Sequence, residues 1–530
     1  MAYAITQACC SDASCVAVCP VNCIHPTPDE PDFGTTDMLY VDPRACIDCG
    51  ACADACPVDA IFPVDALLQG PDAAYADLNR EHYDQDGPDT ERPDPTWAEP
   101  RFPVALEQHA SRLRVAVVGT GPSASYTAAT LLTTSAEVTV IDRLPEAGGL
   151  VRFGVAPDHR STKAIGDRFA TVFRNPRLQL FLGVEVGRDV SHRDLMAHHD
   201  AVVYAVGAST DVALGVPGED LPGSLPARTF VGWYNGHPEV PADLVRLDHA
   251  HLDGDGHGRA VVVGNGNVAL DMARLLLTGS DDLADPATSD LAAHAHEALR
   301  ASRVREVVVV ARRGPAEAAY SLSELRPFLR REDLEVVVDG GPEVADVIAT
   351  ATRGSKAAAL QGLSVRPLDP SAPVGPRRRL VLRFDTVVQG IDGDDRVRSV
   401  RLGPTGGPSH AAVSLPTTLV LRSVGYRSEA VPDLPFDPTT HTVPHELGRV
   451  VDPSTGSPVS GAYVVGWVKR GARGGIGTNR ADAAETVTSL VRDANTGRIT
   501  AGRGSTRSVR RLLTPRRVLP PDREPVAGRA

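Results

Sequence analysis

Residues 113–124 read Leu-Arg-Val-Ala-Val-Val-Gly-Thr-Gly-Pro-Ser-Ala. The first half is a short apolar run with the pattern of a buried strand. It continues directly into a G-x-G-x-x-A turn formed by Gly119, Gly121 and Ala124. The first glycine makes a tight turn, the second lets a diphosphate approach the backbone, and the small alanine lets the following helix pack closely. Because a helix N-terminus attracts anions, the stretch predicts an α/β Rossmann-like unit that binds a dinucleotide.

A second apolar run, Val138–Ile141, follows this turn and ends in Asp142. An acid about 20 residues after the turn is at the right distance to bind a ribose hydroxyl. The pair of features favours an occupied dinucleotide site over an empty turn of the same shape.

The same pattern occurs a second time. Ala260–Val263 precedes Gly264-Asn265-Gly266-Asn267-Val268-Ala269, and a further apolar run, Val307–Ala311, ends in Arg312 and Arg313. Two arginines where an acid would bind a ribose fit a 2′-phosphate, which distinguishes NADP from NAD. The interval before these arginines is long, and we interpret Thr278–Ser302 as an excursion outside the unit.

All nine cysteines lie between Cys9 and Cys56. An odd number argues against a disulfide framework. Cys46-x2-Cys49-x2-Cys52-x3-Cys56-Pro57 has the spacing of bacterial ferredoxins, in which three thiolates bind one 4Fe–4S cluster and the fourth binds the other cluster. An earlier copy, Cys9-x2-Asp12-x2-Cys15-x3-Cys19-Pro20, has Asp12 in place of its second cysteine.

This crossing pattern predicts two ligand sets. An intact 4Fe–4S cluster is expected on Cys19, Cys46, Cys49 and Cys52, and a second cluster on Cys9, Cys15 and Cys56. The second cluster is either 3Fe–4S or a 4Fe–4S with an oxygen ligand from Asp12, and Cys10 could replace Cys9 if the loop shifts. The module resembles seven-iron ferredoxins, although their first loop is longer. We interpret Cys23 as a buried, inert thiol.

The 530 residues suggest three or four domains. Apolar runs stay far below the ~18 residues that span a bilayer, and the first ten residues lack the features of a secretory or transit peptide. We therefore expect a cytoplasmic protein with no membrane span, and nothing indicates a nucleic-acid partner. Of the net charge of −13, residues 1–62 carry nine acids and one base, and residues 63–112 eleven acids and four bases. The latter stretch, rich in Pro, Asp and Glu, predicts an extended acidic linker.

Five further segments resemble adrenodoxin reductase and its bacterial ferredoxin–NADP(+) reductase relatives. They are Gly149–His159, Phe230–Gly236, Arg312–Pro315, Ser423–Tyr426 and Gly466–Gly471. The resemblance covers residues 113 to about 490 and implies an α/β flavoprotein with two dinucleotide-binding (Rossmann-like) domains. It implies a FAD domain made of residues 113–214 and 413–497, with an NADP domain, residues 215–412, inserted in it. The ferredoxin-like α+β iron–sulfur domain (1–62) and the linker (63–112) precede these domains, and a basic tail (498–530) follows.

The resemblance also implies site residues. FAD is expected on the first turn, Gly119 and Gly121, and on Ser123, Asp142, Leu150, Val186, Trp467, Gly474, Gly475 and Ile476. The NADP pyrophosphate is expected on Asn265, Gly266, Asn267 and Val268, and the 2′-phosphate region near Arg312, Arg313 and Glu324. His159 and Glu324 are the candidate catalytic residues, with His159 as a proton relay or docking residue.

Together these features predict an oxidoreductase in which hydride passes between NADPH and FAD. Single electrons then pass to the clusters of its own ferredoxin domain, to a separate ferredoxin, or to another iron–sulfur or haem acceptor. One alternative is an electron-input subunit of a larger complex, such as the small subunit of glutamate synthase, which should lack the block Val151–His159. A second is a redox sensor that does not turn over.

Basic residues accumulate on the segments expected to border the flavin. They are Arg152, Arg160, Lys163, Lys469, Arg470, Arg473 and Arg480. Because opposite charges orient partners, we expect the acidic N-terminal domain to dock there through charge complementarity, and salt to weaken that docking.

The two arginines at the strand end generate a test of nucleotide choice. The unaltered protein should prefer NADPH over NADH by about tenfold or more in kcat/KM, because a charge-assisted phosphate contact contributes on the order of 1.5–3 kcal/mol. The double substitution Arg312→Ala/Arg313→Ala should remove most of that preference. Equal use of both nucleotides by the unaltered protein, measured in steady state, would contradict the assignment.

Overall fold

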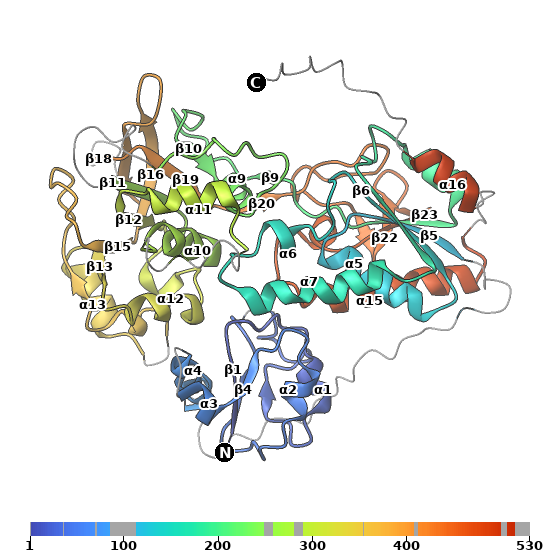
Figure 1. Ribbon diagram of the computed structural model, residues 1–530, viewed down its shortest axis with the longest axis horizontal. Coiled ribbons are helices and arrows are strands. Elements are labelled where there is room, and N and C mark those ends of the chain that lie inside the picture. Colours follow the sequence, from blue (N-terminus) through green and yellow to red (C-terminus); the bar gives the residue numbers. More distant parts are fainter. Residues whose placement is uncertain are drawn as a thin grey trace, which may run out of the picture.

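In the computed structural model two α/β lobes lie side by side, and an N-terminal module lies beneath their junction (Figure 1). The structure describes residues 2–34, 36–68, 72–84, 106, 113–247, 258–279, 283, 290–352, 355–407, 412–499 and 506–514. Most of the expected linker between 85 and 112 and most of the basic tail lie outside these residues. Within the described part of the chain, no helix is both long and apolar enough to cross a membrane.

The first lobe, residues 113–209 and 428–514, is built on a seven-stranded sheet. Its central strands are parallel and mostly apolar, as expected for strands that helices cover on both faces. The strand order is β21 (His445–Glu446), β22 (Arg449–Asp452), β23 (Ser457–Val464), β8 (Ala201–Tyr204), β5 (Arg114–Val118), β6 (Glu137–Asp142) and β7 (Leu178–Leu182). The helices are α5 (Pro122–Thr133), α6 (Leu150–Phe153), α7 (Arg160–Phe173), α8 (His192–His198), α14 (Trp467–Arg470), α15 (Thr478–Asn495) and α16 (Thr506–Leu513).

The second lobe, residues 212–425, holds another seven-stranded sheet whose paired strands are all parallel. Its order is β10 (Ser224–Pro226), β19 (Leu419–Arg422), β11 (Gly258–Val263), β12 (Val304–Val310), β15 (Arg378–Arg383), β13 (Leu334–Asp339) and β14 (Ser364–Val365). A three-stranded sheet joins β16 (Thr386–Asp392), β17 (Ser399–Pro404) and β18 (Val413–Pro416). The helices are α9 (Ala227–Tyr234), α10 (Asn267–Leu276), α11 (Ala293–Arg300), α12 (Leu322–Leu329) and α13 (Pro342–Ala349), with short 3-10 turns at Pro315–Glu317 and Ala358–Leu360.

The chain passes between the lobes at a small antiparallel pair, β9 (Thr210–Asp211) with β20 (Tyr426–Arg427). The chain first crosses from the first lobe to the second close to the domain boundary that was expected near residue 214. It crosses back later than the boundary expected at residue 413, because residues 413–422 still form β18 and β19 of the second lobe. The prediction that Thr278–Ser302 lies outside this unit is also wrong for the last part of that stretch, because α11 buries Ala295 and Leu299 in the core of the second lobe.

The N-terminal module, residues 2–84, is larger than expected. It contains β1 (Tyr3–Ile5), α1 (Ser14–Val18), β2 (Ile24–His25), β3 (Tyr40–Val41), α2 (Ala51–Ala55), β4 (Ile61–Pro63), α3 (Val64–Leu68) and α4 (Ala73–Asp84). The buried Asn79 side chain on α4 accepts the backbone N–H groups of Ile5 and Val41 and donates to the carbonyl of Ile5. The extended linker predicted from residue 63 is therefore wrong for residues 64–84.

The apolar residues of α4 explain this error. Ala74, Tyr75, Leu78 and Tyr83 are buried, and they recur at helical spacing that brings them to one face. The many Pro, Asp and Glu residues that follow between 85 and 112 hide this short amphipathic segment when composition is averaged over the whole stretch.

The module packs tightly against the first lobe. Val151, Ile165 and Phe169 of that lobe share one buried cluster with the cysteines of the module, and Tyr126 and Ile476 pack against it. The backbone N–H of Gly477 donates to the carbonyl of Cys10 at 2.7 Å. Arg480 pairs with Asp12 at 3.3 Å. This side of the junction is mainly apolar.

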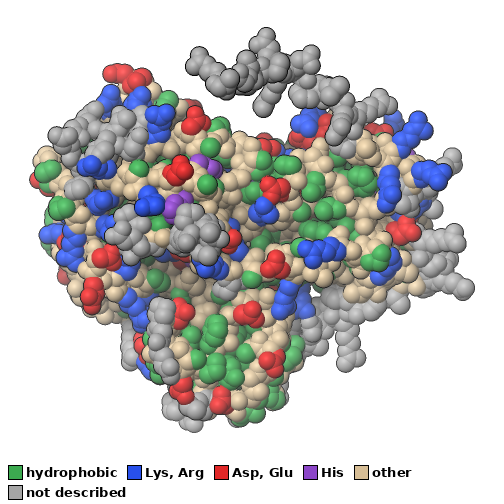
Figure 2. All heavy atoms as spheres, in the orientation of Figure 1, with side chains coloured by type: hydrophobic (Ala, Val, Ile, Leu, Met, Phe, Trp, Pro, Cys, Tyr) green, Lys and Arg blue, Asp and Glu red, His purple; other side chains and the backbone are tan. Residues whose placement is uncertain are grey.

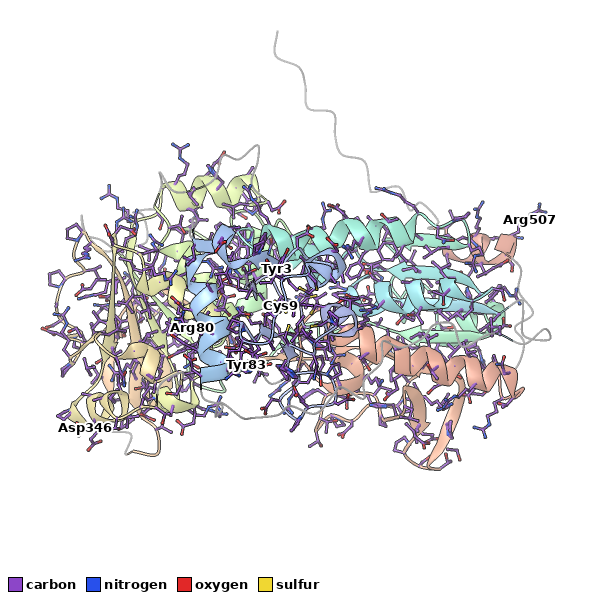
Figure 3. All side chains as sticks on the ribbon, turned by 90° about the horizontal axis from the view of Figure 1, so that it is seen from below. Tyr3, Cys9, Arg80, Tyr83, Asp346 and Arg507 are labelled. Carbon is purple, nitrogen blue, oxygen red and sulfur yellow. The ribbon has the colours of Figure 1, made fainter. Side chains whose placement is uncertain are left out.

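The module also reaches the second lobe through α4 and the loop before β3. The Tyr75 hydroxyl lies 3.3 Å from the carbonyl of Ser323, Arg326 pairs with Glu81, and the N–H of Leu322 donates to Asp37 at 2.9 Å. Seen from below, Cys9 lies near the division between the lobes, and the helix that carries Arg80 and Tyr83 runs along the second lobe (Figure 3). The module therefore contacts both lobes at once.

The structure does not show the expected docking of the N-terminal module on a basic face of the first lobe. Lys469 and Arg470 pair with Asp482, and Arg152 pairs with Glu146. These charges are neutralised within the first lobe. Of the basic residues expected to border the flavin, Arg480 pairs with a carboxylate of the module, that of Asp12. Because apolar packing and buried hydrogen bonds are screened little by salt, we expect a salt-resistant interface.

Gly477 offers a direct test of this interface. A Cβ atom at this position would lie 2.1 Å from the Cys10 carbonyl oxygen and 2.3 Å from the Asp12 nitrogen. Gly477→Ala should therefore push the module away and destabilise the protein by about 1–3 kcal/mol. Gly375→Ala is the matched control, because a Cβ there has no neighbour within 4 Å and the residue lies outside both dinucleotide sites. Thermal unfolding compares the two variants, and equal melting temperatures would contradict close docking at Gly477.

Candidate functional site

The first glycine turn has the shape of a diphosphate cradle. A Cβ on Gly119 would lie 2.5 Å from the Ala205 carbonyl oxygen, so this position requires glycine, whereas a Cβ on Gly121 would meet nothing within 4 Å. Asp142, at the end of the neighbouring strand, accepts the Thr120 hydroxyl at 2.6 Å. The predicted acid thus lies beside the turn, and the open space above Gly121 fits a bound phosphate.

Loops from the end of the chain complete this site. The Ser123 hydroxyl donates to Asn479 at 2.7 Å, and the Trp467 indole N–H donates to the Gly474 carbonyl at 3.2 Å. Trp467 stacks on Tyr426 with ring centroids 5.9 Å apart. The structure therefore brings Ser123 next to Trp467 and the segment Gly474–Ile476, which come some 340 residues later in the chain.

The remaining predicted FAD contacts lie at the same edge of the first lobe. Leu150 opens α6, directly after Gly149, whose own Cβ would lie 2.8 Å from Gly121. The side chain of Leu150 is 38% exposed, which suits a residue covered by a ligand. Val186 forms a bridge with Val190 just after Val184, whose N–H donates to the Asp142 carbonyl. An extended dinucleotide fits this row of residues.

The second turn repeats the cradle. Gly264 lies against the Ser423 carbonyl, while a Cβ on Gly266 would meet nothing within 4 Å. Asn267 accepts the N–H of Ser321, and the buried Nδ2 of Asn265 has no hydrogen-bond partner within the described part of the chain. An unpaired buried amide is costly. Its position in the turn therefore points to a ligand, and the site fits a second dinucleotide.

Arg312 and Arg313 lie where the sequence predicted. They follow β12, whose last residue, Val310, pairs with Val263 immediately before the second turn. Both side chains are exposed. Among the described residues, neither shares a hydrogen bond or ion pair with Glu324.

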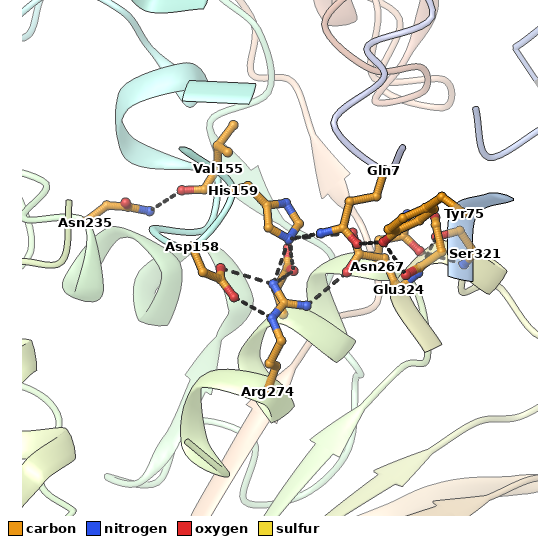
Figure 4. Close-up of polar contacts among 12 residues, drawn as sticks. Gln7, Tyr75, Val155, Asp158, His159, Asn235, Asn267, Arg274, Ser321 and Glu324 are labelled. Atoms are coloured by element: carbon orange, nitrogen blue, oxygen red, sulfur yellow. Dashed lines mark hydrogen bonds and ion pairs between the residues drawn. The ribbon is translucent and has the colours of Figure 1, made fainter. Parts of the chain in front are cut away.

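Glu324 instead joins His159. Both contact Arg274 of α10, which donates to Glu324 at 2.9 Å and to Nε2 of His159 at 2.8 Å (Figure 4). Arg274 also donates to Asp158 at 2.6 Å and to Asp271 at 2.6 Å. The two candidate catalytic residues are thus held in one network where α7, α10 and α12 meet.

Burial and charge act against each other in this network. Burial and the neighbouring Asp271 raise the pKa of the Glu324 carboxyl, and His159 and Arg274 partly offset this. Burial also disfavours ionised Asp158, yet Arg274 lowers the pKa of that carboxyl below its ordinary value. His159, Asp271 and Glu324 converge as metal ligands would, but the Arg274 guanidinium already lies among them and supplies the positive charge.

The cysteines divide as the spacing predicted. Cys19, Cys46, Cys49 and Cys52 line one small cavity together with Tyr3, Cys23 and Ile47. Cys49 is exposed, so this set opens to solvent. The Cys23 thiol lies 3.4 Å from the Cys19 sulfur, and the hydrogen bond between them lowers the pKa of Cys19. This set of four thiols fits a 4Fe–4S cluster.

Cys9, Cys15 and Cys56 form the second set. Burial raises the pKa of Cys9 to about 11 and also raises the pKa values of Cys15 and Cys56. The Cys9 and Cys56 sulfurs accept backbone N–H groups from Ser11 and Ala60. Donors of this kind stabilise the negative charge of a cluster, and these residues therefore fit one.

Asp12 lies beside this second set, but its carboxylate is already bound. One oxygen accepts the backbone N–H of Ser14 at 3.2 Å, and the other accepts its hydroxyl and pairs with Arg480. The residue that replaces a cysteine thus anchors α1 and the junction with the first lobe.

Several residues of the site gave no signal in the sequence. Arg274 lies on the amphipathic helix α10, where an arginine more often faces solvent, and Gln7 and Tyr75 belong to a different module. Only Asp271 and Arg274, three apart on one helix, form a pair that spacing alone could suggest.

Comparisons with known proteins agree with this site. A family model for a 4Fe-4S binding domain matches residues 39–62, and one for pyridine nucleotide-disulphide oxidoreductases matches residues 113–314. A probable ferredoxin/ferredoxin–NADP reductase of Mycobacterium leprae is 45% identical over 94% of this chain and 88% of its own length. The NADPH-ferredoxin reductase FprA of Mycobacterium tuberculosis is 42% identical over 72% of this chain and 83% of its own length.

A solved structure shows the same architecture. FprA of Mycobacterium tuberculosis in complex with NADPH superposes with a TM-score of 0.64, at 38% identity, and covers 76% of this chain and 90% of its own. This chain, with its two lobes, paired glycine turns and cysteine sets, thus matches the probable ferredoxin/ferredoxin–NADP reductase of Mycobacterium leprae over nearly its whole length. The chain belongs to the ferredoxin/ferredoxin–NADP reductase family.

Proposed function

We propose that this chain acts as a ferredoxin–NADP(+) reductase that passes electrons from NADPH, through FAD, into the iron–sulfur clusters of its own N-terminal module. The observation that carries this proposal is the fixed position of the module. Its cysteines share a buried cluster with Val151, Ile165 and Phe169 of the first lobe, next to the loop Gly474–Ile476. A separate carrier would have to diffuse to that place.

The geometry supports an assignment of residues to each cofactor. The first turn, Asp142 and Trp467 would hold FAD; the second turn and Arg312–Arg313 would hold NADP. Bound FAD accepts a hydride and gives up electrons singly, as one-electron clusters require. The chain's own groups would orient these partners, and His159 and Glu324 lie 3.8 Å apart near the second turn.

The two cysteine sets suggest the order of the electron path. The set Cys9, Cys15 and Cys56 is on the side that faces the first lobe, since Arg168 donates to the Cys56 carbonyl and Gly477 to the carbonyl of Cys10. Cys49, in the other set, is exposed. We infer that the first set carries the proximal cluster and that the second set carries the distal cluster, which transfers electrons to an outside acceptor.

The outside acceptor would be a ferredoxin or another iron–sulfur or haem protein. Figure 2 shows acidic and apolar side chains side by side on the exposed surface of the module. Ile47, beside Cys46, is 58% exposed. All nine cysteines are free, which suits a reducing compartment, and we infer a cytoplasmic location.

The contacts of Asp12 bear on the type of the proximal cluster. Both carboxylate oxygens already accept hydrogen bonds from Ser14, and one of them also pairs with Arg480. An iron would have to compete with these partners. We therefore infer a 3Fe–4S proximal cluster held by three thiolates, next to a 4Fe–4S distal cluster.

Removing one cluster at a time tests the path. Cys49→Ala should leave reduction of FAD and of the proximal cluster by NADPH unchanged but slow the reduction of an added acceptor by about tenfold or more. Cys15→Ala should leave FAD reduction intact while the distal cluster stays oxidised on that timescale. Rapid freeze-quench EPR of the full chain follows each centre. If the distal cluster of Cys15→Ala were reduced as fast as in the unaltered protein, the order would be wrong.

Asp12→Cys tests the cluster type. A fourth thiolate at this position should convert the proximal centre into a 4Fe–4S cluster and raise the iron content from about seven to about eight per chain. Asp12→Asn is the matched control, which loses the charge but gains no thiolate, and it should keep the 3Fe–4S EPR signal. Two indistinguishable 4Fe–4S centres in the unaltered protein, prepared without air, would contradict the inference.

A further inference from the structure

Gln7 of the N-terminal module reaches into the network around His159. It follows β1 by two residues, and its side-chain amide lies between two groups from other parts of the chain. Its Nε2 is 3.1 Å from Nε2 of His159, and its Oε1 accepts the hydroxyl of Tyr75 on α4 (Figure 4). Gln7 and Tyr75 belong to the module, whereas His159 belongs to the first lobe.

The neighbours of His159 determine which ring nitrogen carries its proton. Arg274 approaches Nε2 at 2.8 Å, and an arginine has only donors to offer. Nε2 must therefore be an acceptor. Because the Tyr75 hydroxyl occupies the amide oxygen of Gln7, the amide presents its N–H to the same Nε2. Two donors converge on one nitrogen, which places the ring proton on Nδ1.

Carboxylates from three parts of the chain lie close to His159. Asp158 precedes His159 at the start of α7, Asp271 comes from α10 and Glu324 from α12. Asp271 and Glu324 lie 3.6 and 3.8 Å from Nε2. These three carboxylates all pair with the Arg274 guanidinium. The N–H of Gln7 is the contact that the module adds to His159.

The position of His159 connects it to both glycine turns. It ends the segment that begins at Gly149 beside the first turn, and its partner Arg274 lies on α10, which starts at Asn267 of the second turn. A group held here can respond to the docking of the module and to the nucleotide. The network Tyr75–Gln7–His159–Arg274 is a continuous path between them.

We propose that Gln7 is a positioning residue of the NADP(H) site, through which the docked N-terminal module fixes the orientation of His159 and holds its Nε2 as a hydrogen-bond acceptor. The iron–sulfur module thus completes the shell of the nucleotide site in addition to receiving electrons. This inference rests on the proposed function, because it takes the second turn as the site of NADP(H).

The test is the pH dependence of NADP+ binding to the FAD-loaded full chain, measured as the perturbation of the flavin absorbance without turnover. The step attributed to His159 is the one that His159→Gln removes. Gln7→Glu replaces the donor with a carboxylate acceptor, which stabilises an imidazolium, so the midpoint of that step should rise by about one pH unit or more. Gln7→Leu, which only removes the donor, should shift the midpoint in the same direction by less.

Two controls separate positioning from loss of docking. Glu81→Gln breaks the pair with Arg326 at the same junction without touching His159, and its profile should match that of the unaltered protein. In the His159→Gln background, Gln7→Glu should cause no shift. The binding measurement needs no cluster reduction, so a failed electron path would leave its outcome unaffected.

Three results would overturn the inference. The first is a Gln7→Glu profile that superimposes on that of the unaltered protein. The second is an equal shift in Glu81→Gln, which would assign the effect to docking alone. The third is a shift that persists without His159, which would assign it to Asp271 or Glu324 instead.

Discussion

The hydrogen bond from the Gly477 N–H to the Cys10 carbonyl joins the start of α15 to the loop of the proximal cysteine set. The packing of the module on the first lobe includes this close backbone approach. It requires glycine at position 477, because a side chain there would overlap the backbone of residues 10–12. It also holds Asp12 within reach of Arg480 and brings Ile476 against the cysteine cluster.

From this contact the module spans both lobes. Its cysteine side packs on α5 and α7 of the first lobe, and α4 packs on α12 of the second lobe. Relative motion of the two lobes therefore has to move or distort the module. Because α12 also carries Glu324, and the N–H of its N-cap residue Ser321 donates to Asn267 of the second turn, two contacts connect the module to that turn.

Local sequence patterns were sufficient wherever a short motif forms its own site. The two glycine turns, Asp142, Arg312–Arg313 and the crossing of the cysteine ligands were all predicted from spacing within a strand, a turn and a helix start. The structure shows the two turns, Asp142 beside the first of them, and four of the cysteines around one cavity. The approach of Ser123 to the distant segment that contains Trp467 and Gly474 needed the family resemblance, because no local pattern connects residues so far apart.

The errors share a different cause. Residues 64–84 looked like linker because their apolar face is short and the composition around it is polar. The basic residues near the flavin looked like a docking face because sequence shows charge but not its partner; Lys469 and Arg470 are both paired with Asp482. The role of Arg274 depends on three helices that meet only in the folded chain. Burial and tertiary partners decide each of these, and neither can be read from one segment.

The measurement that bears most directly on a fixed module is the salt dependence of electron transfer within the chain. NADPH is mixed with the oxidised full-length protein in a stopped-flow instrument at ionic strengths from about 0.05 to 0.5 M, over which exposed charges become strongly screened. With the packed junction seen here, the rate constant for reduction of the clusters should change by less than about twofold, like that of FAD. A fall of about tenfold in cluster reduction, with FAD reduction unchanged, would contradict it and restore a mobile domain that docks by charge.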